Sequence, residues 1–292
     1  MQTLSEIRSM LAEAGLSPLR RFGQSFLVDG NLMAKLIELA DVTGAQTVLE
    51  VGSGTGSLTE ELLVRAGGVV AVEIDRGLCR LLRGRLGGRE NITLIEGDVL
   101  DGKGSLSAAV LKALPDGACL VANLPYNIAT PLIANCLAGS WRVVAGGAGG
   151  RRFDRLTFTV QQQVADRLAA GPGGGEYGPI SVQVALLGRL TLGAGVPPTA
   201  FWPAPKVASR MVRIDFDAVA AERLKSIDAL RSVLTLSFGQ RRKQIGTIIR
   251  KGSSALSAER LVAALELAAV DPRSRGEAIS PQQYLVIANA VS

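Results

Sequence analysis

The sequence contains no histidine among its 292 residues. A Ser-His-Asp triad and any metal site with an imidazole ligand are therefore excluded. Cysteine is scarce as well: Cys79, Cys119 and Cys136 lie in apolar stretches without Cys-x-x-Cys spacing, so we expect buried free thiols in a reducing compartment. Apolar runs stay well short of the roughly 20 residues that a membrane-spanning helix needs, and residues 1–9 lack the apolar core of a signal peptide. We therefore expect a cytoplasmic protein without a membrane segment.

The chain is basic and has enough apolar residues for a large core. Its 32 Lys and Arg residues exceed its 26 Asp and Glu residues, which gives a net charge of +6 and a pI of about 9.5. This excess suits a polyanionic partner such as RNA. Hydrophobic residues make up 47% of the chain, and its length allows one large domain and one small domain.

Alternating strand and helix patterns from about residue 46 to residue 214 predict an α/β fold with a mostly parallel sheet. The predicted strands are Thr47–Val51, Val69–Ile74, Ile92–Ile95, Ala118–Ala122, Leu156–Val160 and Arg210–Ile214. After about residue 219 the sequence has no strand pattern of comparable strength. The helices predicted there are Ala221–Phe238, Lys243–Arg250, Ser257–Leu267 and Pro281–Val291. We therefore expect residues 1–218 to form the α/β domain and residues 219–292 a small all-helical domain.

A glycine-rich turn follows the first predicted strand. Gly52, Gly54 and Gly56 stand between Thr47–Val51 and a helical pattern that begins at Ser57. Strand, glycine turn and helix together form the nucleotide-binding half of a doubly wound fold. The spacing is tighter than the dinucleotide-binding G-x-G-x-x-G pattern, and the turn lacks the lysine of a Walker loop. The turn alone is a weak signal for a nucleoside site.

Acidic residues follow the next two strands in order. Glu73 ends the second strand, where it can accept hydrogen bonds from both hydroxyls of a ribose. Asp98 follows the third strand, where it can accept from an adenine amino group while Val99 packs on the ring. Any one of these acidic residues is more often a helix cap or a solvated loop residue. Their order after the glycine turn favours a site for an uncharged ribose and base.

Asn123-Leu124-Pro125-Tyr126 follows the buried run Ala118–Ala122, at the edge where a parallel sheet binds ligands. The Asn123 side-chain oxygen and the Leu124 carbonyl can accept both N–H groups of a nucleobase amine, which localises the nitrogen lone pair. A Tyr126 ring stacked on the base would hold that nitrogen in line for attack. The turn therefore predicts methyl transfer to a base amine, a reaction that needs no strong general base.

Taken together, these motifs resemble those of the KsgA-type ribosomal RNA adenine N6,N6-dimethyltransferases. Further segments that resemble the family are Arg21–Leu27, Val72–Asp75, Asn123–Pro131, Gln162–Leu168, Glu176–Gly178, Val196–Val207 and Phe238–Lys243. Any one of them could be accidental, but their joint occurrence in order, over nearly the whole chain, is highly specific. The resemblance implies a Rossmann-like class I methyltransferase fold and S-adenosyl-L-methionine as cofactor. It also implies dimethylation of N6 in two adjacent adenosines of a 3'-terminal hairpin of small-subunit (16S) rRNA during ribosome biogenesis.

The resemblance completes the expected site. It implies that the segment with Ser25 and Leu27 closes over the methionine end of the cofactor. The expected cofactor-binding residues are Ser25, Leu27, Gly52, Gly54, Glu73, Asp98, Val99 and Asn123. The expected catalytic residues are Asn123, Leu124, Tyr126 and Phe201. Phe201 would face the target adenine from the side opposite Tyr126, and a position in the hydrophobic core is an equal alternative for it.

Basic residues near the expected site are predicted to bind RNA. An isolated basic cluster is often only a solvated helix end, but the resemblance favours contacts with phosphates. The expected RNA-binding residues are Arg20, Arg21, Lys206, Arg241, Arg242 and Lys243. The chain departs from the family at three positions, since the family usually has Asn at Ser25, Glu at Gln163 and Asp at Ala208. The departure at Ser25 weakens the expected contact with the cofactor.

The expected partner is the immature small ribosomal subunit, and nothing in the sequence demands more than a monomer. A large-subunit rRNA methyltransferase that confers antibiotic resistance is one alternative, although that group resembles Asn-Ile-Pro-Tyr where this chain has Leu124. A dinucleotide-dependent dehydrogenase would need the longer glycine spacing and a catalytic acid such as histidine. A ribosome-assembly factor that has lost catalysis is the third alternative.

Overall fold

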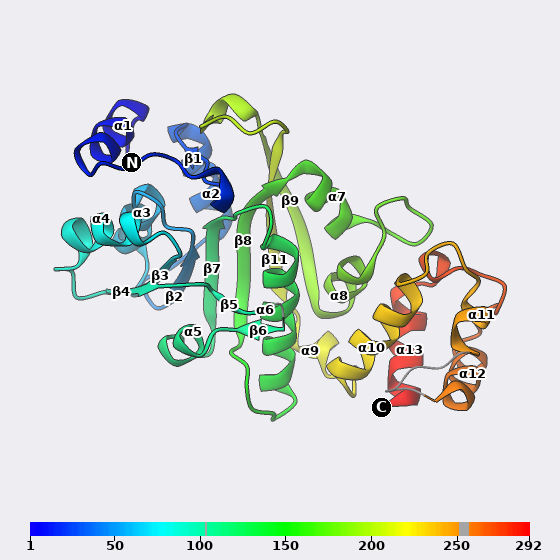
Figure 1. Ribbon diagram of the computed structural model, residues 1–292. Helices are drawn as coiled ribbons and strands as arrows, with labels where there is room; N and C mark the ends of the chain where they lie inside the picture. Colours follow the sequence, from blue (N-terminus) through cyan, green and yellow to red (C-terminus); the bar gives the residue numbers. More distant parts are fainter. Residues whose placement is uncertain (103, 251–256) are drawn as a thin grey trace.

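The computed structural model describes residues 1–102, 104–250 and 257–292. Its strands are β1 Phe26–Leu27, β2 Thr47–Val51, β3 Gly68–Glu73, β4 Ile92–Glu96, β5 Leu100–Asp101, β6 Ser105–Leu106, β7 Ala118–Asn123, β8 Phe153–Gln161, β9 Gly188–Val196, β10 Phe201–Trp202 and β11 Ser209–Phe216. Seven of them form the central sheet in the order β4-β3-β2-β7-β8-β11-β9 (Figure 1). The strands from β4 to β8 pair in parallel, whereas β11 is antiparallel to both β8 and β9. The predicted α/β fold with a mostly parallel sheet is confirmed.

Helices cover both faces of this sheet. The helices of the described residues are α1 Leu4–Glu13, α2 Gly30–Ala40, α3 Ser57–Arg65, α4 Arg76–Leu86, α5 Ala108–Ala113, α6 Ala129–Val144, α7 Gln162–Ala169, α8 Pro179–Leu187, α9 Ala218–Ala221, α10 Ile227–Phe238, α11 Ile245–Ile249, α12 Ala258–Leu267 and α13 Pro281–Val291, with the 3-10 helices η1 Arg20–Phe22, η2 Pro198–Ala200 and η3 Gly276–Ala278. Successive strand residues face opposite sides, so Val48 packs with α2, α3 and α4, whereas Leu49 packs with α5, α6 and α8. Burial on both faces explains why the strands are nearly continuous apolar runs.

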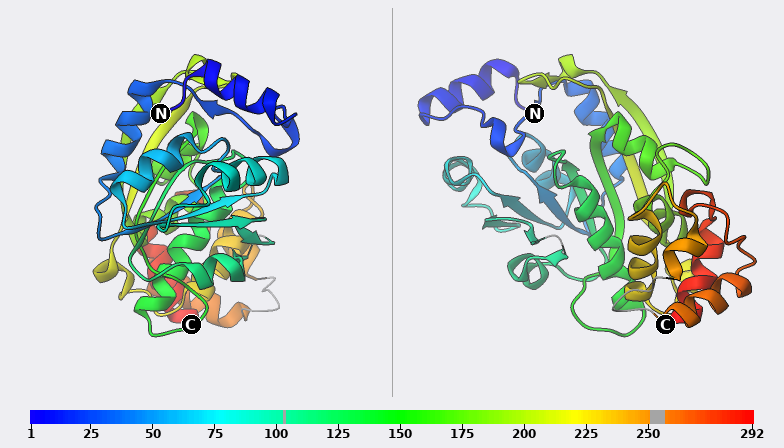
Figure 2. Two further views of the ribbon diagram at one scale, coloured as in Figure 1. Left: turned by 90° about the vertical axis from the view of Figure 1, so that its left-hand side faces the viewer. Right: turned by 45° about the vertical axis from the view of Figure 1, so that its right-hand side comes forward.

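The C-terminal helices α10 to α13 pack at the end of the molecule that is remote from α1 (Figures 1 and 2). The hydrophobic cluster around α6 and α8 continues into them. The buried hydroxyl of Tyr177 donates a hydrogen bond to the carbonyl of Ile279 at 2.9 Å, and the Trp141 indole donates to the carbonyls of Ala221 and Leu224. Because one core spans both parts, the domain boundary near residue 219 stays a prediction.

One predicted helix was wrong, and two elements were missed. The single helix expected at Ala221–Phe238 is divided into α9 and α10, because the Ser226 side chain accepts a hydrogen bond from the Ala229 N–H and starts a new helix. Two further elements, α8 and β9, follow the glycine-rich loop at residues 171–175 and were not among those predicted. Seven of the nine residues of α8 are buried, and a helix that is apolar on nearly every side lacks the helical hydrophobic period.

Two expectations about the whole chain can be compared with the structure. None of the helices in the described ranges has the length and apolar character needed to span a membrane. Cys79, Cys119 and Cys136 are buried and free, as predicted. Burial raises the pKa of each of these thiols, so none of them is a reactive thiolate at neutral pH.

Candidate active site

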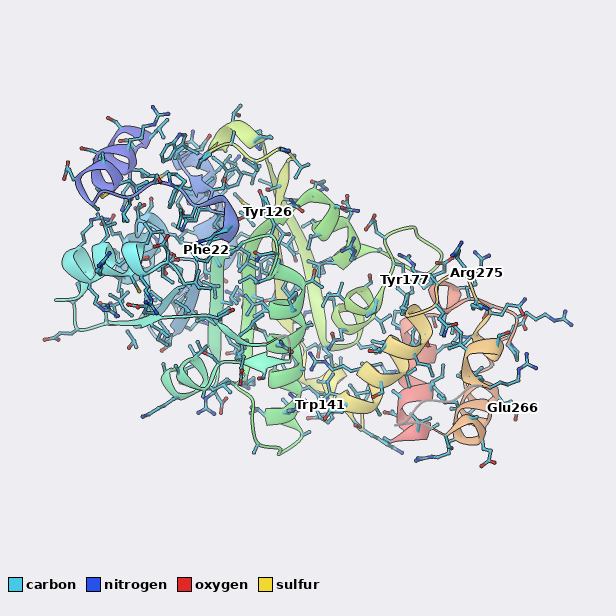
Figure 3. The ribbon with its side chains drawn as sticks, viewed as in Figure 1. Phe22, Tyr126, Trp141, Tyr177, Glu266 and Arg275 are labelled. Atoms are coloured by element: carbon cyan, nitrogen blue, oxygen red, sulfur yellow. The ribbon has the colours of Figure 1, made fainter. Side chains whose placement is uncertain are left out.

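A cleft opens at the carboxyl ends of β2, β3 and β7, and about 1180 Å³ of space lies within it, part of it open to solvent. Strand β2 has β3 on one side and β7 on the other, so the strand order reverses here. Doubly wound sheets bind their ligands at such a point. Phe22 of the N-terminal segment and Tyr126 both line the cleft, and Figure 3 shows both near the upper end of the sheet.

The glycine-rich turn between β2 and α3 forms one wall of the cleft. Gly52, Gly54 and Gly56 have φ values of 75°, 59° and 87°, which side-chain-bearing residues rarely adopt. A Cβ atom on Gly54 would lie 2.9 Å from the Phe26 ring, and one on Gly56 would lie 2.8 Å from Leu82. The glycines therefore let the backbone approach its neighbours closely. Gly52 and Gly54 line the cleft, as their expected role in cofactor binding requires.

Glu73 at the end of β3 is only 4% exposed, and its carboxylate organises the cleft. One oxygen accepts a hydrogen bond from the Gly54 N–H at 2.8 Å, and the other accepts from the Asp75 N–H at 2.9 Å. Burial raises the pKa of Glu73, and these two backbone donors oppose the shift. Each carboxylate oxygen keeps a lone pair that could accept from a ribose hydroxyl.

Asp98 and Val99, after β4, also line the cleft. One oxygen of the exposed Asp98 carboxylate accepts a hydrogen bond from the Leu100 N–H at 2.9 Å. Within the described part of the chain the other oxygen accepts none, so it can receive a ligand's N–H. Val99 is buried in the hydrophobic core and shows only its edge to the cleft, which suits contact with a flat ring.

Glu50 is a cleft residue that the sequence reasoning missed. It lies within the apolar strand β2, is 1% exposed and lines the cleft. Its carboxylate accepts a hydrogen bond from the Thr59 hydroxyl at 2.6 Å. Burial raises the pKa of Glu50 to about 7. The sequence signal that could have identified Glu50 is a carboxylate inside an otherwise apolar strand. A charged group at such a position lowers the stability of the fold unless it is paired.

The raised pKa of Glu50 makes stability depend on pH. The folded state holds the proton more tightly than the unfolded chain, so the resulting stabilisation is present below about pH 4.5 and is lost as the pH rises through about 7. Glu50→Gln keeps an acceptor for Thr59 but has no charge to bury. We expect it to match the wild type near pH 4.5 and to exceed it by roughly 3 kcal/mol in free energy of unfolding near pH 8.5. Urea unfolding at both pH values tests this, and an equal difference at both would contradict it.

The Asn123 side chain is held on both sides. Its amide nitrogen donates a hydrogen bond to the main-chain carbonyl of Ser25 at 2.8 Å. Its amide oxygen accepts a hydrogen bond from the hydroxyl of Thr159 on β8. An amide oxygen has two lone pairs, so one remains for a ligand in the cleft.

Leu124 and Tyr126 complete the turn. The Leu124 side chain is buried, and no residue in the described part of the chain donates a hydrogen bond to its carbonyl. The Tyr126 hydroxyl lies 2.9 Å from that of Ser209 on β11, and the two are hydrogen-bonded. Asn123, Leu124 and Tyr126 all line the cleft, so the structure brings together two acceptors that each keep a lone pair and an aromatic ring.

Residues 22–27 of the N-terminal segment line the cleft and are tied to the proline-rich loop Val196–Val207. Strand β1 pairs with β10, and the Phe26 and Trp202 rings stack with centroids 6.2 Å apart. The Ser25 hydroxyl donates a hydrogen bond to the Pro203 carbonyl at 2.7 Å. Ser25 and Leu27 both line the cleft. The hydroxyl that replaces the family's usual Asn is thus engaged with the proline-rich loop.

Phe201 does not occupy the position expected for a base-contacting ring. It is 4% exposed and packs in the hydrophobic cluster on the α2 face of the sheet, with Leu27 and Met211. It is not among the described residues that line the cleft. Pairing of β10 with β1 places its side chain in the core. The structure therefore favours the alternative that Phe201 is a core residue.

The basic residues expected to bind RNA fall into different environments. Lys206, Arg242 and Lys243 are exposed, and none of their side chains has a hydrogen-bond or ion-pair partner among the described residues. The exposed Arg21 lies over the Phe22 ring at 4.8 Å, and the side chain of Arg20 is outside the described part. Arg241 instead donates to the carbonyls of Gly175 and Tyr177 and faces Glu277 at 3.6 Å. Arg241 thus links the loop before α8 to the C-terminal helices.

The cleft is acidic in a protein of net positive charge. Glu50, Glu73 and Asp98 line it, and no Lys or Arg is found among its described lining residues. Phosphate sites need cations or several inward N–H donors, so a dinucleotide or nucleoside triphosphate fits poorly. A nucleoside with a positively charged group fits well, because the carboxylates complement the charge. These residues therefore suit the sulfonium cofactor implied by the resemblance.

Comparison with known proteins agrees with this chemistry. The family model for "Ribosomal RNA adenine dimethylase" matches residues 17–292. The chain belongs to this family. A family member from Moorella thermoacetica, named "Ribosomal RNA small subunit methyltransferase A", is 34% identical over 287 residues, covering 97% of this chain and 96% of its own. A protein of the same name from Phenylobacterium zucineum is 37% identical over 290 residues, covering 99% and 94%.

Solved structures show the same fold. A dimethyladenosine transferase from Plasmodium falciparum has a TM-score of 0.69 and 22% identity, covering 90% of this chain and 95% of its own. The 23S rRNA methyltransferase ErmE has a TM-score of 0.61 and 25% identity, covering 91% and 99%. The predicted family, the class I methyltransferase fold and the assignment to the rRNA adenine dimethyltransferases are confirmed.

Proposed function

We propose that this dimethyltransferase uses S-adenosyl-L-methionine to dimethylate N6 of two adjacent adenosines in the 3'-terminal hairpin of small-subunit rRNA, within the immature subunit. The observation that carries the proposal is a pair of acceptors with lone pairs to spare, Asn123 Oδ1 and the Leu124 carbonyl, at the edge of an acidic cleft. The name shared by the relatives in two bacteria supports the small subunit as substrate.

Different residues of the cleft bind different parts of the cofactor. Glu73 accepts from the ribose hydroxyls with the lone pairs that Gly54 and Asp75 leave free. Asp98 accepts from the adenine amino group, and Val99 packs on that ring. Bound S-adenosyl-L-methionine supplies an electrophilic methyl group on a sulfonium centre. The acidic lining offsets the positive charge of that centre.

The Asn123–Tyr126 turn prepares the target amine. The adenosine must leave its stack to enter the cleft. Asn123 Oδ1 and the Leu124 carbonyl then accept the two N6–H groups, which concentrates the nitrogen lone pair toward the incoming methyl group. The Tyr126 ring stacks on the base and fixes its plane. Methylation makes the nitrogen cationic and strongly acidic, so its surplus proton passes to water and no histidine is needed.

Exposed basic residues fit the phosphates of the RNA. Arg21, Lys206, Arg242 and Lys243 are exposed and available for phosphate contacts. Arg241 is already bound to carbonyls of the protein, so we assign it to packing of the C-terminal helices. We expect it to contribute little to binding of the RNA.

Methyl incorporation into separated ribosomal particles tests the proposed substrate. Small and large subunits from cells that lack this protein would be incubated with purified protein and methyl-labelled cofactor. We expect label only in the small subunit, recovered as N6,N6-dimethyladenosine after digestion of its rRNA. Label in the large subunit would replace the proposal with the antibiotic-resistance activity. Absence of label from both would leave a non-catalytic assembly factor.

A further inference from the structure

We propose that two buried hydroxyls, those of Thr159 on β8 and Ser209 on β11, are positioning residues that aim Asn123 and Tyr126 at the target base. This inference rests on the proposed function, because it concerns the same methyl transfer. Neither residue touches the cleft, and neither belongs to the motifs that the sequence singled out. Both act through a side chain that does line it.

The contacts of Asn123 determine which way its amide faces. The main-chain carbonyl of Ser25 can only accept a hydrogen bond, so the amide nitrogen must lie on that side. The amide oxygen then lies beside Thr159, whose hydroxyl donates to it. An amide turned the other way would put its oxygen against the Ser25 carbonyl. It would also offer N–H donors where the target amine needs an acceptor.

The sheet places the Thr159 hydroxyl at this point. Strand β8 runs parallel to β7, and Thr159 is the direct partner of Asn123 in their register. The Leu124 N–H donates to the Thr159 carbonyl at 3.3 Å, so the backbone at the turn is tied to the same residue. Thr159 is 1% exposed, and a β-branched side chain has few rotamers in a strand. Its hydroxyl is therefore a fixed donor for the catalytic amide.

Ser209 provides the corresponding contact for Tyr126. In the antiparallel pairing of β8 with β11, Ser209 lies opposite Gln161, two residues after Thr159. Cross-strand partners and residues two apart share one face of a sheet, so both hydroxyls project from the same face. Ser209 is 1% exposed, and its hydroxyl is 2.9 Å from that of Tyr126. The ring is thereby held at its outer end while its face stays open to the base.

Thr157 offers a matched control on the same strand. It lies two residues before Thr159, so it projects from the same face, and it is fully buried. Its hydroxyl has no hydrogen-bond partner in the described part of the structure. Thr157→Val makes the same replacement in the same strand as Thr159→Val, but it leaves the hydrogen bonds of Asn123 intact.

Single-turnover methyl transfer to small subunits, at saturating cofactor and RNA, tests the role of Thr159. We expect Thr159→Val to lower the rate about tenfold, the order of a lost hydrogen bond between buried groups. Thr159→Ser should restore the rate to within about threefold of wild type, and Thr157→Val should leave it unchanged. Calorimetry should give the same affinity for S-adenosylhomocysteine within about twofold in all of these variants.

A double-mutant cycle separates positioning from general damage. Once Asn123 is alanine, Thr159→Val should cause no further loss of rate, because its effect passes through Asn123. Ser209→Ala and Tyr126→Phe should each slow transfer a few-fold, and their combination should be no slower than either alone. Circular dichroism verifies folding, and Thr159→Ala replaces the valine variant if that variant does not fold.

Several results would overturn the inference. It would be overturned if Thr159→Val had the wild-type rate of transfer. The same holds if Thr159→Val lowered the rate as much in the Asn123→Ala background as in the wild type, or if the rate losses of Ser209→Ala and Tyr126→Phe were additive. A serine variant as slow as the valine variant would also contradict a role for the hydroxyl. A wild-type protein that methylates no small subunit would instead defeat the proposed function, so the two failures are distinguishable.

Discussion

Replacing Asn123 by alanine is expected to lower the rate of methyl transfer by roughly 100-fold to 1000-fold, the loss seen when one preorganised polar contact is removed from a reacting centre. The variant loses the side-chain acceptor for one N6–H group, so the nitrogen lone pair is no longer concentrated toward the methyl group. Single-turnover transfer of labelled methyl groups to small subunits measures this rate. The affinity for S-adenosylhomocysteine should change by less than about threefold, because Glu73 and Asp98 remain in place.

Asn31→Ala is a matched control for this experiment. Asn31 is exposed on α2 and does not line the cleft, so the same substitution there should leave both the rate and the affinity unchanged. If Asn123→Ala weakened cofactor binding as much as it slowed transfer, Asn123 would be a binding residue without a special role at the target amine.

Replacing Glu73 by alanine is expected to weaken cofactor binding by about 100-fold or more. Hydrogen bonds to a charged acceptor contribute roughly 1.5–3 kcal/mol each, and Glu73 can accept from two ribose hydroxyls. The substitution also removes the acceptor of the Gly54 and Asp75 N–H groups, so the glycine turn loses its anchor. Isothermal calorimetry with S-adenosylhomocysteine gives the affinity directly. At saturating cofactor the rate of transfer should fall much less than the affinity.

Glu96→Ala is the corresponding control on the neighbouring strand. Glu96 is the register partner of Glu73 in the β3–β4 pair, but it is exposed and forms ion pairs with Arg76 and Arg83. Exposed ion pairs contribute little, so its removal should change cofactor affinity by less than about twofold. An affinity that survived Glu73→Ala would show that the ribose is held elsewhere.

Glu50 links the charge of the cleft to the stability of the protein. It is a buried carboxylate whose pKa is raised to about 7, and it lies in the same acidic cleft as Glu73. Burying a charge without a counterion is costly, so the carboxylate destabilises the protein above neutral pH. Proteins keep such costs mainly where a site needs them. A cationic ligand in the cleft would offset this cost.

The local sequence determined the parts of this protein whose chemistry lies in a short segment. The apolar runs predicted the strands of the parallel sheet, because strands buried on both faces must be apolar throughout. The glycine turn, Glu73, Asp98 and the Asn123–Tyr126 turn were predicted to form one site, because the carboxyl ends of parallel strands meet at one edge. The structure places Gly52, Gly54, Glu73, Asp98 and the Asn123–Tyr126 turn along one cleft.

Only the tertiary structure decided which side chains are hydrogen-bonded or buried, and which distant residues they contact. The Ser25 hydroxyl binds the Pro203 carbonyl 178 residues away, and the Tyr126 hydroxyl binds Ser209 83 residues away. Phe201 is in the core because β10 pairs with β1. The pKa of Glu50 is raised because the folded chain buries its carboxyl group. No local sequence pattern predicts such contacts, since the residues around a hydroxyl or a ring do not specify which distant segment will pack against it. They arise only when the sheet brings its strands together.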